Sequence, residues 1–339
     1  MMNVACLGRA LSGAVPALLL VACAGSQNAA LAPEANRPPA DIRGNARGGC
    51  PTSRCIVVAD IGSKPGGAIL FFPRSANGNV PPIGEIKGSK TQLDLPSAIE
   101  MDSAGNIYAA NRNSDTITVY SSGSLGNVAP IRTISGSNTQ LDYPTGIAFD
   151  RKGNLYVVNF NNSSITVYAP NADGDAKPIR TIVGGNTMML NPWGIALDSK
   201  SNIYVAANFD SVAIYPAKSN GNVSPERFIS GSATQLSDPQ GIAVDASGYT
   251  YVANWEGTTL AEFAPDANGN VAPARQESNL YAPDGVALDA QGKTYVSNGC
   301  QDDPDFVDVF AAGANNAQPL RTITGSKTKV RCVSSILVR

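Results

Sequence analysis

The chain of 339 residues contains no histidine. Imidazole is the side chain most often used as a general base near neutral pH and as a ligand for transition metals. Its absence excludes Ser-His-Asp and Cys-His catalysis, histidine-ligated zinc sites and haem sites with a histidine ligand. Any catalysis would depend on carboxylates, lysine, tyrosine, cysteine or an oxygen-ligated metal.

Charge is also scarce, because charged residues make up only 15% of the chain and the formal net charge is -2. A nucleic-acid partner requires a clustered basic face, and this composition gives no support for one. The hydrophobic content of 43% is sufficient for a packed core. With 33 glycines and 23 prolines, the chain is rich in turns.

The N-terminus has the pattern of an export signal over residues 1–22. Arg9 precedes an apolar run, residues 10–22, that is too short to span a bilayer comfortably. The run ends in Leu-Val-Ala-Cys at Cys23, which resembles the bacterial lipobox and implies lipidation of Cys23. Ordinary signal cleavage after the A-x-A-like residues 22–24 is the alternative.

Residues 23–49 are rich in proline, alanine, asparagine and glycine and show no apolar periodicity. This composition predicts a flexible tether between Cys23 and a folded body at 50–339. We therefore expect an exported lipoprotein of the cell envelope. It would lie at the outer membrane or face the periplasm or cell surface, with the lipid as its only membrane contact.

The body consists of repeats that each contain four short β-strands. A first strand reads Pro-x-Gly-Ile-Ala-x-Asp, and its prolines recur every 44 to 48 residues. A second strand follows with the pattern Ile-Tyr-Val-x-Asn, and a third with Ile-Thr-Val-Tyr. A Gly-Asn turn and a Pro-x-Arg segment then predict a fourth strand, with its proline on the sheet edge. The prolines that open the first strands are Pro96, Pro144, Pro192, Pro239 and Pro283.

Four strands in about 47 residues correspond to one blade of a β-propeller. Residues 56–60 match a second strand that lacks a first strand before it, and residues 333–339 match the missing one. We therefore predict an all-β, six-bladed propeller of four-stranded antiparallel blades. The C-terminal strand joins blade 1 and removes the free edge of the ring.

At these motifs, residues 56–339 resemble the NHL-repeat β-propellers. The resemblance runs through P-x-G-[IV]-A-x-D, G-N-[IL]-Y-V-x-N and x-I-T-V-Y. It is specific for architecture and weak for function, because one fold serves many activities.

Four cysteines remain in the body, and an even number in an exported protein favours disulfides. The repeat register predicts a Cys300–Cys332 bridge between blades 6 and 1 and a local Cys50–Cys55 bridge. Reduced thiols are the alternative.

Candidate ligand residues converge on the rim where first strands begin and second strands end. The residues that end the second strands are Asp60, Asn111, Asn159, Asn208, Asn254 and Asn298. The residues that directly follow the first-strand prolines are Ser97, Thr145, Trp193, Gln240 and Asp284. Together they would form a polar cup. Alternatively, each asparagine caps its own strand through bonds to the backbone.

Departures from the repeat are more informative about a site, because a binding site requires asymmetry. Phe160, Phe209 and Trp255 follow the asparagines, and with Trp193 they predict an aromatic patch suited to a sugar or another flat ligand. Packing between blades is the alternative. Glu100 replaces the alanine of the other inner strands, and residues 301–305 form an acidic loop that we interpret as solvated.

Two functions from different classes follow. The first is a non-enzymatic binding or scaffold module that holds a protein or carbohydrate partner on its rim and needs no cofactor. The second is a hydrolase similar to the six-bladed calcium lactonases. That resemblance implies a Ca²⁺ ion held by Glu100, Asn159, Asn208 and Asp284. The E-G-P motif of those enzymes is missing from this sequence.

Overall fold

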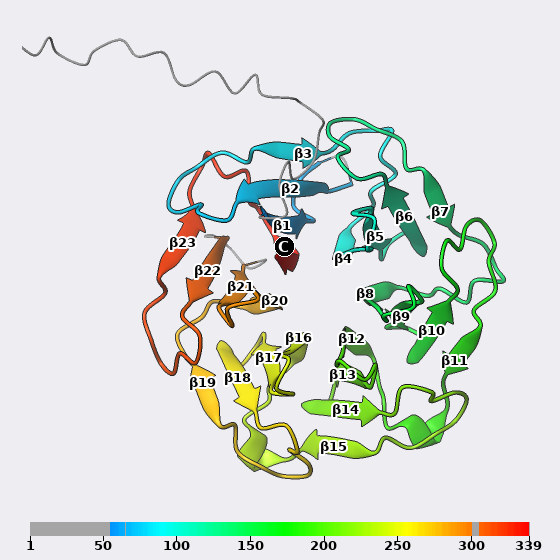
Figure 1. The fold of residues 1–339 in the computed structure, drawn as a ribbon, viewed down its shortest axis with the longest axis vertical. Helices are drawn as coiled ribbons and strands as arrows, with labels where there is room; N and C mark the ends of the chain where they lie inside the picture. The colour runs from blue at the N-terminus through cyan, green and yellow to red at the C-terminus, as the bar shows by residue number, and fades with distance from the viewer. Residues whose placement is uncertain (1–54, 65, 300–304, 339) are drawn as a thin grey trace, which may run out of the picture. The chain divides into compact units, whose positions relative to one another are not determined.

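The computed structural model describes residues 55–64, 66–299 and 305–338. The chain divides into two units, Met1–Asn45 and Ala46–Arg339, and all described residues lie in the second. That unit contains six four-stranded antiparallel sheets arranged as blades around an axis, as the sequence predicts (Figure 1). Described helices are single turns, η1 (Gly185–Thr187) and η2 (Ser232–Thr234), and neither could cross a membrane.

Each blade has two inner strands that alternate in direction. The first strands are β24 (Val333–Val338), β4 (Pro96–Met101), β8 (Pro144–Phe149), β12 (Pro192–Leu197), β16 (Pro239–Val244) and β20 (Pro283–Leu288). The second strands are β1 (Cys55–Asp60), β5 (Ile107–Asn111), β9 (Leu155–Asn159), β13 (Ile203–Ala207), β17 (Thr250–Asn254) and β21 (Thr294–Asn298).

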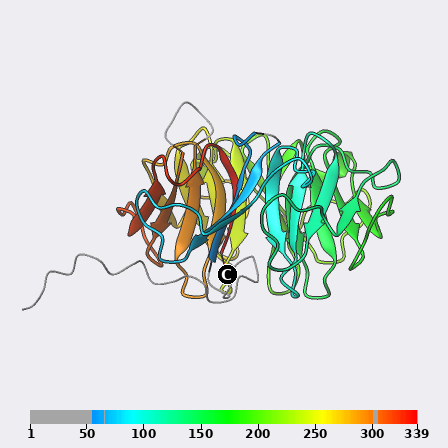
Figure 2. The same ribbon diagram turned by 90° about the horizontal axis from the view of Figure 1, so that it is seen from above.

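Two further strands complete each blade on its outer side. The third strands are β2 (Ala68–Pro73), β6 (Thr116–Tyr120), β10 (Ser164–Tyr168), β14 (Ser211–Tyr215), β18 (Thr259–Phe263) and β22 (Phe306–Phe310). The fourth strands are β3 (Gly84–Ile86), β7 (Arg132–Ile134), β11 (Arg180–Ile182), β15 (Arg227–Ser230), β19 (Arg275–Glu277) and β23 (Arg321–Thr324). Seen from the side, the strands run between the two faces of the ring (Figure 2).

The ring is closed by the C-terminal strand, as predicted. Blade 1 has the strand order β24-β1-β2-β3, and β24 pairs antiparallel with β1 from Ile56↔Val338 to Ala59↔Ser335. In Figure 1 the red end of the chain accordingly lies beside the blue β1. This pairing joins the two ends of the propeller and covers an inner edge that would otherwise be exposed.

The hydrophobic core is distributed between the blades. In the described residues it forms six clusters, one for each pair of neighbouring blades. Between blades 6 and 1, for example, Ile56 and Leu70 pack in the same cluster as Tyr295 and Val307. Both faces of the inner strands are therefore buried, which explains their continuous apolar runs.

Gly-Asn turns hold neighbouring blades together. Asn127 Oδ1 accepts a hydrogen bond of 2.7 Å from the backbone N–H of Lys90, which follows the last strand of the preceding blade. Gly88 has a φ of 129° there, and a Cβ on it would lie 2.5 Å from the Asn127 side chain, so only glycine fits. The same bond recurs in the pairs Asp175–Asn138, Asn222–Asn186, Asn270–Ala233 and Asn79–Lys327.

The fourth strands begin two residues later than predicted. The prolines expected inside them, such as Pro130, lie before the strand, which begins at Arg132 in blade 2. The physical reason is that proline has no N–H, so the ladder to the third strand starts at the next residue, where Ile131 donates to the Val119 carbonyl. The same offset holds for Pro178, Pro225, Pro273 and Pro319, and residues 79–81 likewise precede β3.

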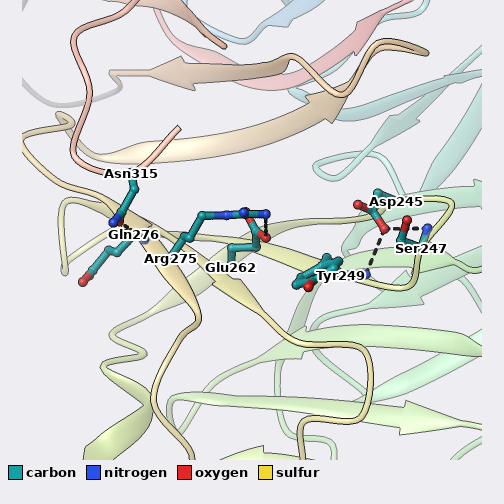
Figure 3. A network of polar contacts seen from close by, with 7 residues as sticks. All are labelled: Asp245, Ser247, Tyr249, Glu262, Arg275, Gln276 and Asn315. Atoms are coloured by element: carbon teal, nitrogen blue, oxygen red, sulfur yellow. Dashed lines mark hydrogen bonds and ion pairs between the residues drawn. The ribbon is translucent and has the colours of Figure 1, made fainter. Parts of the chain in front are cut away.

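The arginine that opens the fourth strand anchors the outer half of a blade. In blades 2 to 4 it donates to the hydroxyl of the second-strand tyrosine, in the pairs Arg132–Tyr108, Arg180–Tyr156 and Arg227–Tyr204. Blade 5 differs, because Arg275 forms a two-bond ion pair with Glu262, and its Nε lies 2.9 Å from Oε2 (Figure 3). Arg275 also stacks over the ring of Tyr249 at 5.5 Å.

Figure 3 shows two further contacts of this blade. Asp245 Oδ1 accepts bonds of 2.8 and 2.9 Å from the backbone N–H groups of Ser247 and Tyr249, which fixes the turn between the first and second strands. The backbone N–H of Gln276 donates to Asn315 Oδ1 at 3.2 Å and ties β19 to blade 6. The aspartate that ends the Pro-x-Gly motif is therefore a turn-forming residue.

A candidate ligand site at one mouth of the axial channel

Every first strand carries a β-bulge at its start. Pro192 pairs with Ala207 and Gly194 with Ala206, so the residue between them, Trp193, has no partner in the ladder. The pairing shifts at the corresponding place in all six blades. A bulge redirects a side chain away from the regular alternation of the strand. The side chain of the bulge residue is therefore not committed to the regular pattern of its own sheet.

Three of the six bulge residues hold the ring together. Ser334, Ser97 and Thr145 donate their hydroxyls to the carbonyl oxygens of Pro96, Pro144 and Pro192 in the next blade, at 2.7, 2.7 and 2.9 Å. Each is at most 5% exposed. The predicted rim residues Ser97 and Thr145 are therefore occupied in bonds between blades.

The other three bulge residues, Trp193, Gln240 and Asp284, line a cavity of about 450 Å³ at this mouth. That volume is within the range of small-molecule pockets. Residues next to the second-strand ends complete most of the wall, namely Ile61, Arg112, Phe160, Asn208 and Trp255. We call this space the mouth cavity.

Local hydrogen bonds hold the wall residues in place. The backbone N–H groups of Arg112, Phe160 and Trp255 each donate to the carbonyl of the residue before the first-strand proline, at 3.0 to 3.3 Å. For Trp255 that residue is Asp238, which itself lines the mouth cavity. The end of the second strand and the start of the first are thus locked together in each of these blades.

The asparagines that end the second strands lie behind this wall. Asn111, Asn159, Asn254, Asn298 and Asp60 are fully buried, and none of them lines the mouth cavity. Asn111, for example, accepts from the backbone N–H of Asp94 at 3.1 Å and donates to Thr118 Oγ1 at 3.1 Å. Related bonds hold the others. These side chains therefore bond within their own blade, to the segment before the first strand and to the third strand, and do not line the cavity.

Blade 4 departs from the predicted register by one residue. Ala207 occupies the position expected for Asn208, because it pairs with both Pro192 and Ser211, as Asn159 does with its partners in blade 3. Asn208 is consequently moved one place onward and lines the mouth cavity. Phe209, which was expected there, is 76% exposed and lies outside the cavity.

Three of the four predicted aromatic residues do gather at the cavity. The rings of Phe160 and Trp193 meet edge to face with centroids 5.5 Å apart, and Trp255 lines the same wall. Tyr143 extends the cluster, with its centroid 5.7 Å from that of Phe160. The exposed aromatic faces provide surface on which a flat ligand could stack.

Arg112 and Asp284 are the ionisable pair of the mouth cavity that carries unpaired buried atoms. The Arg112 guanidinium lies 5.7 Å from the Tyr143 ring centroid and 5.8 Å from that of Trp193. Its Nε is buried and has no hydrogen-bond partner, and the same is true of Asp284 Oδ1. Buried polar atoms without partners are rare in folded proteins and call for an explanation.

Burial raises the pKa of Asp284 to about 8. Loss of water around the carboxyl is the main cause, and the negative charge of Asp238 adds to it, whereas Arg112 and the Trp193 indole favour the ionised form. Asp238 accepts a hydrogen bond of 3.2 Å from the Gln240 side chain. At neutral pH the Asp284 carboxyl is therefore mostly protonated and can act as a hydrogen-bond donor.

Of the residues implied for a calcium site, Asn159 lines neither the mouth cavity nor the narrow channel along the axis. Glu100 lines the narrow channel of about 100 Å³ inside the first strands, and it shares that channel with Asp284. Asn208 lines the mouth cavity, whereas Asn159 is buried within its own blade. The described residues contain no group of three or more Asp, Glu, Cys or His placed to hold a metal ion.

Several predicted residues lie outside the described part of the chain. They are Cys23, Cys50 and Cys300, together with residues 301–304 of the acidic loop. The lipidation of Cys23 and the pairings Cys50–Cys55 and Cys300–Cys332 therefore stay predictions. Cys332 lies at the blade 6 to blade 1 junction, where its backbone N–H donates to Asp60 Oδ1 at 3.0 Å.

Two important wall residues, Arg112 and Asp238, were not among the predicted rim residues. A signal for Arg112 was present, because it directly follows Asn111 just as Phe160 follows Asn159. Asp238 immediately precedes a first-strand proline, a position that the repeat pattern alone does not place at the rim. Comparing the residues on either side of each motif, blade by blade, would have found both.

Comparison with known families adds a partial match. Residues 61–215 match the family model of the SMP-30/gluconolactonase/LRE-like region. The match covers less than half of the chain and includes Arg112, Phe160, Trp193 and Asn208 of the mouth cavity. No protein among the curated sequences matches the chain.

Solved structures share the propeller at low sequence identity. A protein of unknown function from Bacteroides caccae is 12% identical with a TM-score of 0.61, and the alignment covers 84% of this chain and 98% of that one. A functionally unknown protein from Desulfotomaculum acetoxidans is 14% identical with a TM-score of 0.51, over 76% and 75% of the chains. At these identities the likeness shows the fold alone.

Proposed function

We propose that the protein is a non-enzymatic binding module that takes a carbohydrate ligand in the mouth cavity. The observation that carries the proposal is the composition of this wall. It combines the aromatic rings of Phe160, Trp193 and Trp255 with the hydrogen-bonding side chains of Gln240 and Asn208. Sugar rings present apolar faces to aromatic side chains and hydroxyls to polar ones, so this mixture suits them.

The proposal also includes attachment of the propeller to a membrane by a lipid. Lipidation at Cys23 and the spacer 23–49 would present the propeller at the cell envelope, where glycans are abundant. Mass spectrometry of the mature N-terminus tests this part, with an acylated Cys23 as the expected result. A mature chain that begins at Gly25 without lipid would contradict the tether and leave the binding proposal standing.

Tryptophan fluorescence gives a direct test of binding, because the chain has only two tryptophans and both line the mouth cavity. Titration with a panel of oligosaccharides should shift or quench the emission in a saturable way. Calorimetry on the same ligand should show at least tenfold weaker binding for Trp193→Ala. Phe209→Ala is the matched control, because Phe209 is an exposed aromatic in the same rim that lies outside the cavity. Affinity that is unchanged in Trp193→Ala would reject this site.

The alternative is a calcium-dependent lactonase-like enzyme, and the partial family match over residues 61–215 supports keeping it. The geometry opposes it, because Asn159 is separated from the channel that Glu100 lines. Calorimetric titration with Ca²⁺ distinguishes the binding module from the calcium-dependent enzyme. Stoichiometric binding that is lost in Glu100→Ala would favour the enzyme over the binding module.

A further inference from the structure

The mouth cavity contains two unpaired polar atoms that point to a specific kind of ligand group. Among the described residues, four buried side-chain atoms have no hydrogen-bond partner, and two of them, Arg112 Nε and Asp284 Oδ1, belong to residues of this cavity. The other two belong to Arg132 and Glu277, which lie on fourth strands. Half of these unsatisfied atoms therefore belong to the residues of one cavity.

Arg112 is held ready to bind but has no polar partner for its side chain. The rings of Tyr143 and Trp193 fix its guanidinium, and the described residues offer it no side-chain hydrogen bond or ion pair. Arg132, by comparison, donates to the Tyr108 hydroxyl. A guanidinium carries donors only, arranged to match the two oxygens of a carboxylate. An arginine kept unpaired beside a cavity is thus suited to an anionic ligand.

The Asp284 carboxyl adds a second donor at the same place. It is 5% exposed and faces Arg112, Trp193 and Asp238. Since its pKa is raised to about 8, its protonated form can donate a hydrogen bond to a ligand oxygen at neutral pH. Asp238 lines the same cavity, accepts a hydrogen bond from Gln240, and can also accept from sugar hydroxyls.

Resting on the carbohydrate-binding function proposed above, we propose that the mouth cavity selects acidic sugars, with Arg112 and Asp284 binding the sugar carboxylate. The aromatic wall of Phe160, Trp193 and Trp255 stacks against the sugar ring. A uronic acid residue of an acidic glycan has both features. A charge-assisted, two-bond contact between guanidinium and carboxylate is stronger than neutral hydrogen bonds, so the acid is preferred over an uncharged sugar of the same shape.

The test compares uronic acid oligosaccharides with their methyl esters, which keep the sugar ring and remove only the charge. Tetramers of glucuronic, galacturonic and mannuronic acid, each with its ester, are titrated into the full-length protein with tryptophan fluorescence and calorimetry. At least one acid should bind ten times more tightly than its ester. Arg112→Gln should abolish this difference, whereas Arg151→Gln, an exposed arginine away from the cavity, should preserve it.

A pH series gives a second readout that a merely structural role would not produce. Above pH 8 the ionised Asp284 repels a carboxylate, so the affinity for the acid should fall severalfold between pH 7 and 9. In Asp284→Asn that pH dependence should disappear while the preference for the acid remains. An ester that binds as tightly as its acid would overturn the inference but leave carbohydrate binding intact. Failure of every acid and ester to bind, together with every neutral oligosaccharide, would overturn both proposals.

Discussion

The six bulge residues around the axis divide into two halves with different tasks. In blades 1 to 3, the small hydroxyl residues Ser334, Ser97 and Thr145 bind the next blade. In blades 4 to 6, the larger Trp193, Gln240 and Asp284 line the mouth cavity. The backbone position and the bulge are the same in both halves. One repeated position is therefore structural on one side of the ring and available for ligand on the other.

Glycine follows the bulge residue in blades 3 to 6, where it allows the backbone of the next blade to approach closely. Gly194 and Gly241 follow the bulge in the cavity half, and a Cβ on either would collide with the bulge-residue carbonyl of the next blade. In the other half, a Cβ on Gly146 would meet the Trp193 carbonyl at 2.7 Å in the same way, whereas blades 1 and 2 carry Ser335 and Ala98 at this position. Close strand packing at this glycine therefore occurs on both sides of the ring, and the bulge residue itself distinguishes the two halves.

The largest expected effect comes from removing residues 332–339, which breaks the hydroxyl half at Ser334. The deletion removes β24, exposes the edge of β1 and takes Val333 and Ile336 out of the core. Each lost apolar side chain costs about 2–5 kcal/mol. We expect loss of the cooperative thermal transition followed by circular dichroism. Deletion of Arg339 alone is the control, and a truncated chain that melts like the full chain would show that closure is not needed.

A smaller effect, of opposite sign, is expected in the cavity half for Asp284→Asn. In the native state the pKa of Asp284 is raised to about 8 from 3.8, so the folded protein keeps a proton that the unfolded chain releases. Stability is therefore lost as pH rises from about 4 to 8. Asparagine removes this penalty and should stabilise the protein by about 1–4 kcal/mol at pH 7, with no gain at pH 3.

Urea denaturation at several pH values measures this effect. The diagnostic feature is the slope, because the difference between wild type and Asp284→Asn should grow with pH. If the difference in stability between wild type and Asp284→Asn is the same at all pH values, a buried neutral carboxyl is contradicted. A variant that is less stable than wild type at pH 7 would contradict it as well.

The smallest expected effects come from one substitution in each half of the ring, and they test the division between the halves directly. Thr145→Val keeps the shape of the side chain but removes the 2.9 Å bond to the Pro192 carbonyl, and should cost about 1–2 kcal/mol without changing ligand affinity. Gln240→Ala should cost less, about 0.5–1 kcal/mol for the lost 3.2 Å bond to Asp238, and should weaken ligand binding. Denaturation and fluorescence titration of the two variants measure both quantities. If Gln240→Ala is the more destabilising change, the division of the ring is wrong.

Much of the fold was predictable because each blade repeats its own local signals. Proline, glycine and asparagine recur at fixed offsets, so the blade count and the closing strand at residues 333–339 follow from spacing alone. The fourth-strand boundary was predicted two residues too early, since a proline marks the approach to a strand as well as its edge. The register of Asn208 was missed because blade 4 has Ala207 at the strand-end position and its asparagine one place later.

The candidate site was predictable in position but not in its details. Trp193, Gln240 and Asp284 stand out because they interrupt a pattern, and the structure brings them together with Trp255 and Phe160. Nothing in the spacing shows that Ser97 and Thr145 bond to the next blade, because those bonds join residues 47 positions apart in sequence. The spacing also does not show that the Arg112 side chain lacks a polar partner among the described residues. That depends on all the residues that the fold places around it.

The sequence by itself determined the six blades, the closure of the ring and the rim on which unlike residues meet. It did so because β-turns and strand alternation are local and repeat with the chain. Only the tertiary structure decided which rim residues are occupied between blades and which face the cavity. Those outcomes depend on the distance between blades and on the water excluded from Asp284, and both are set by the whole ring at once.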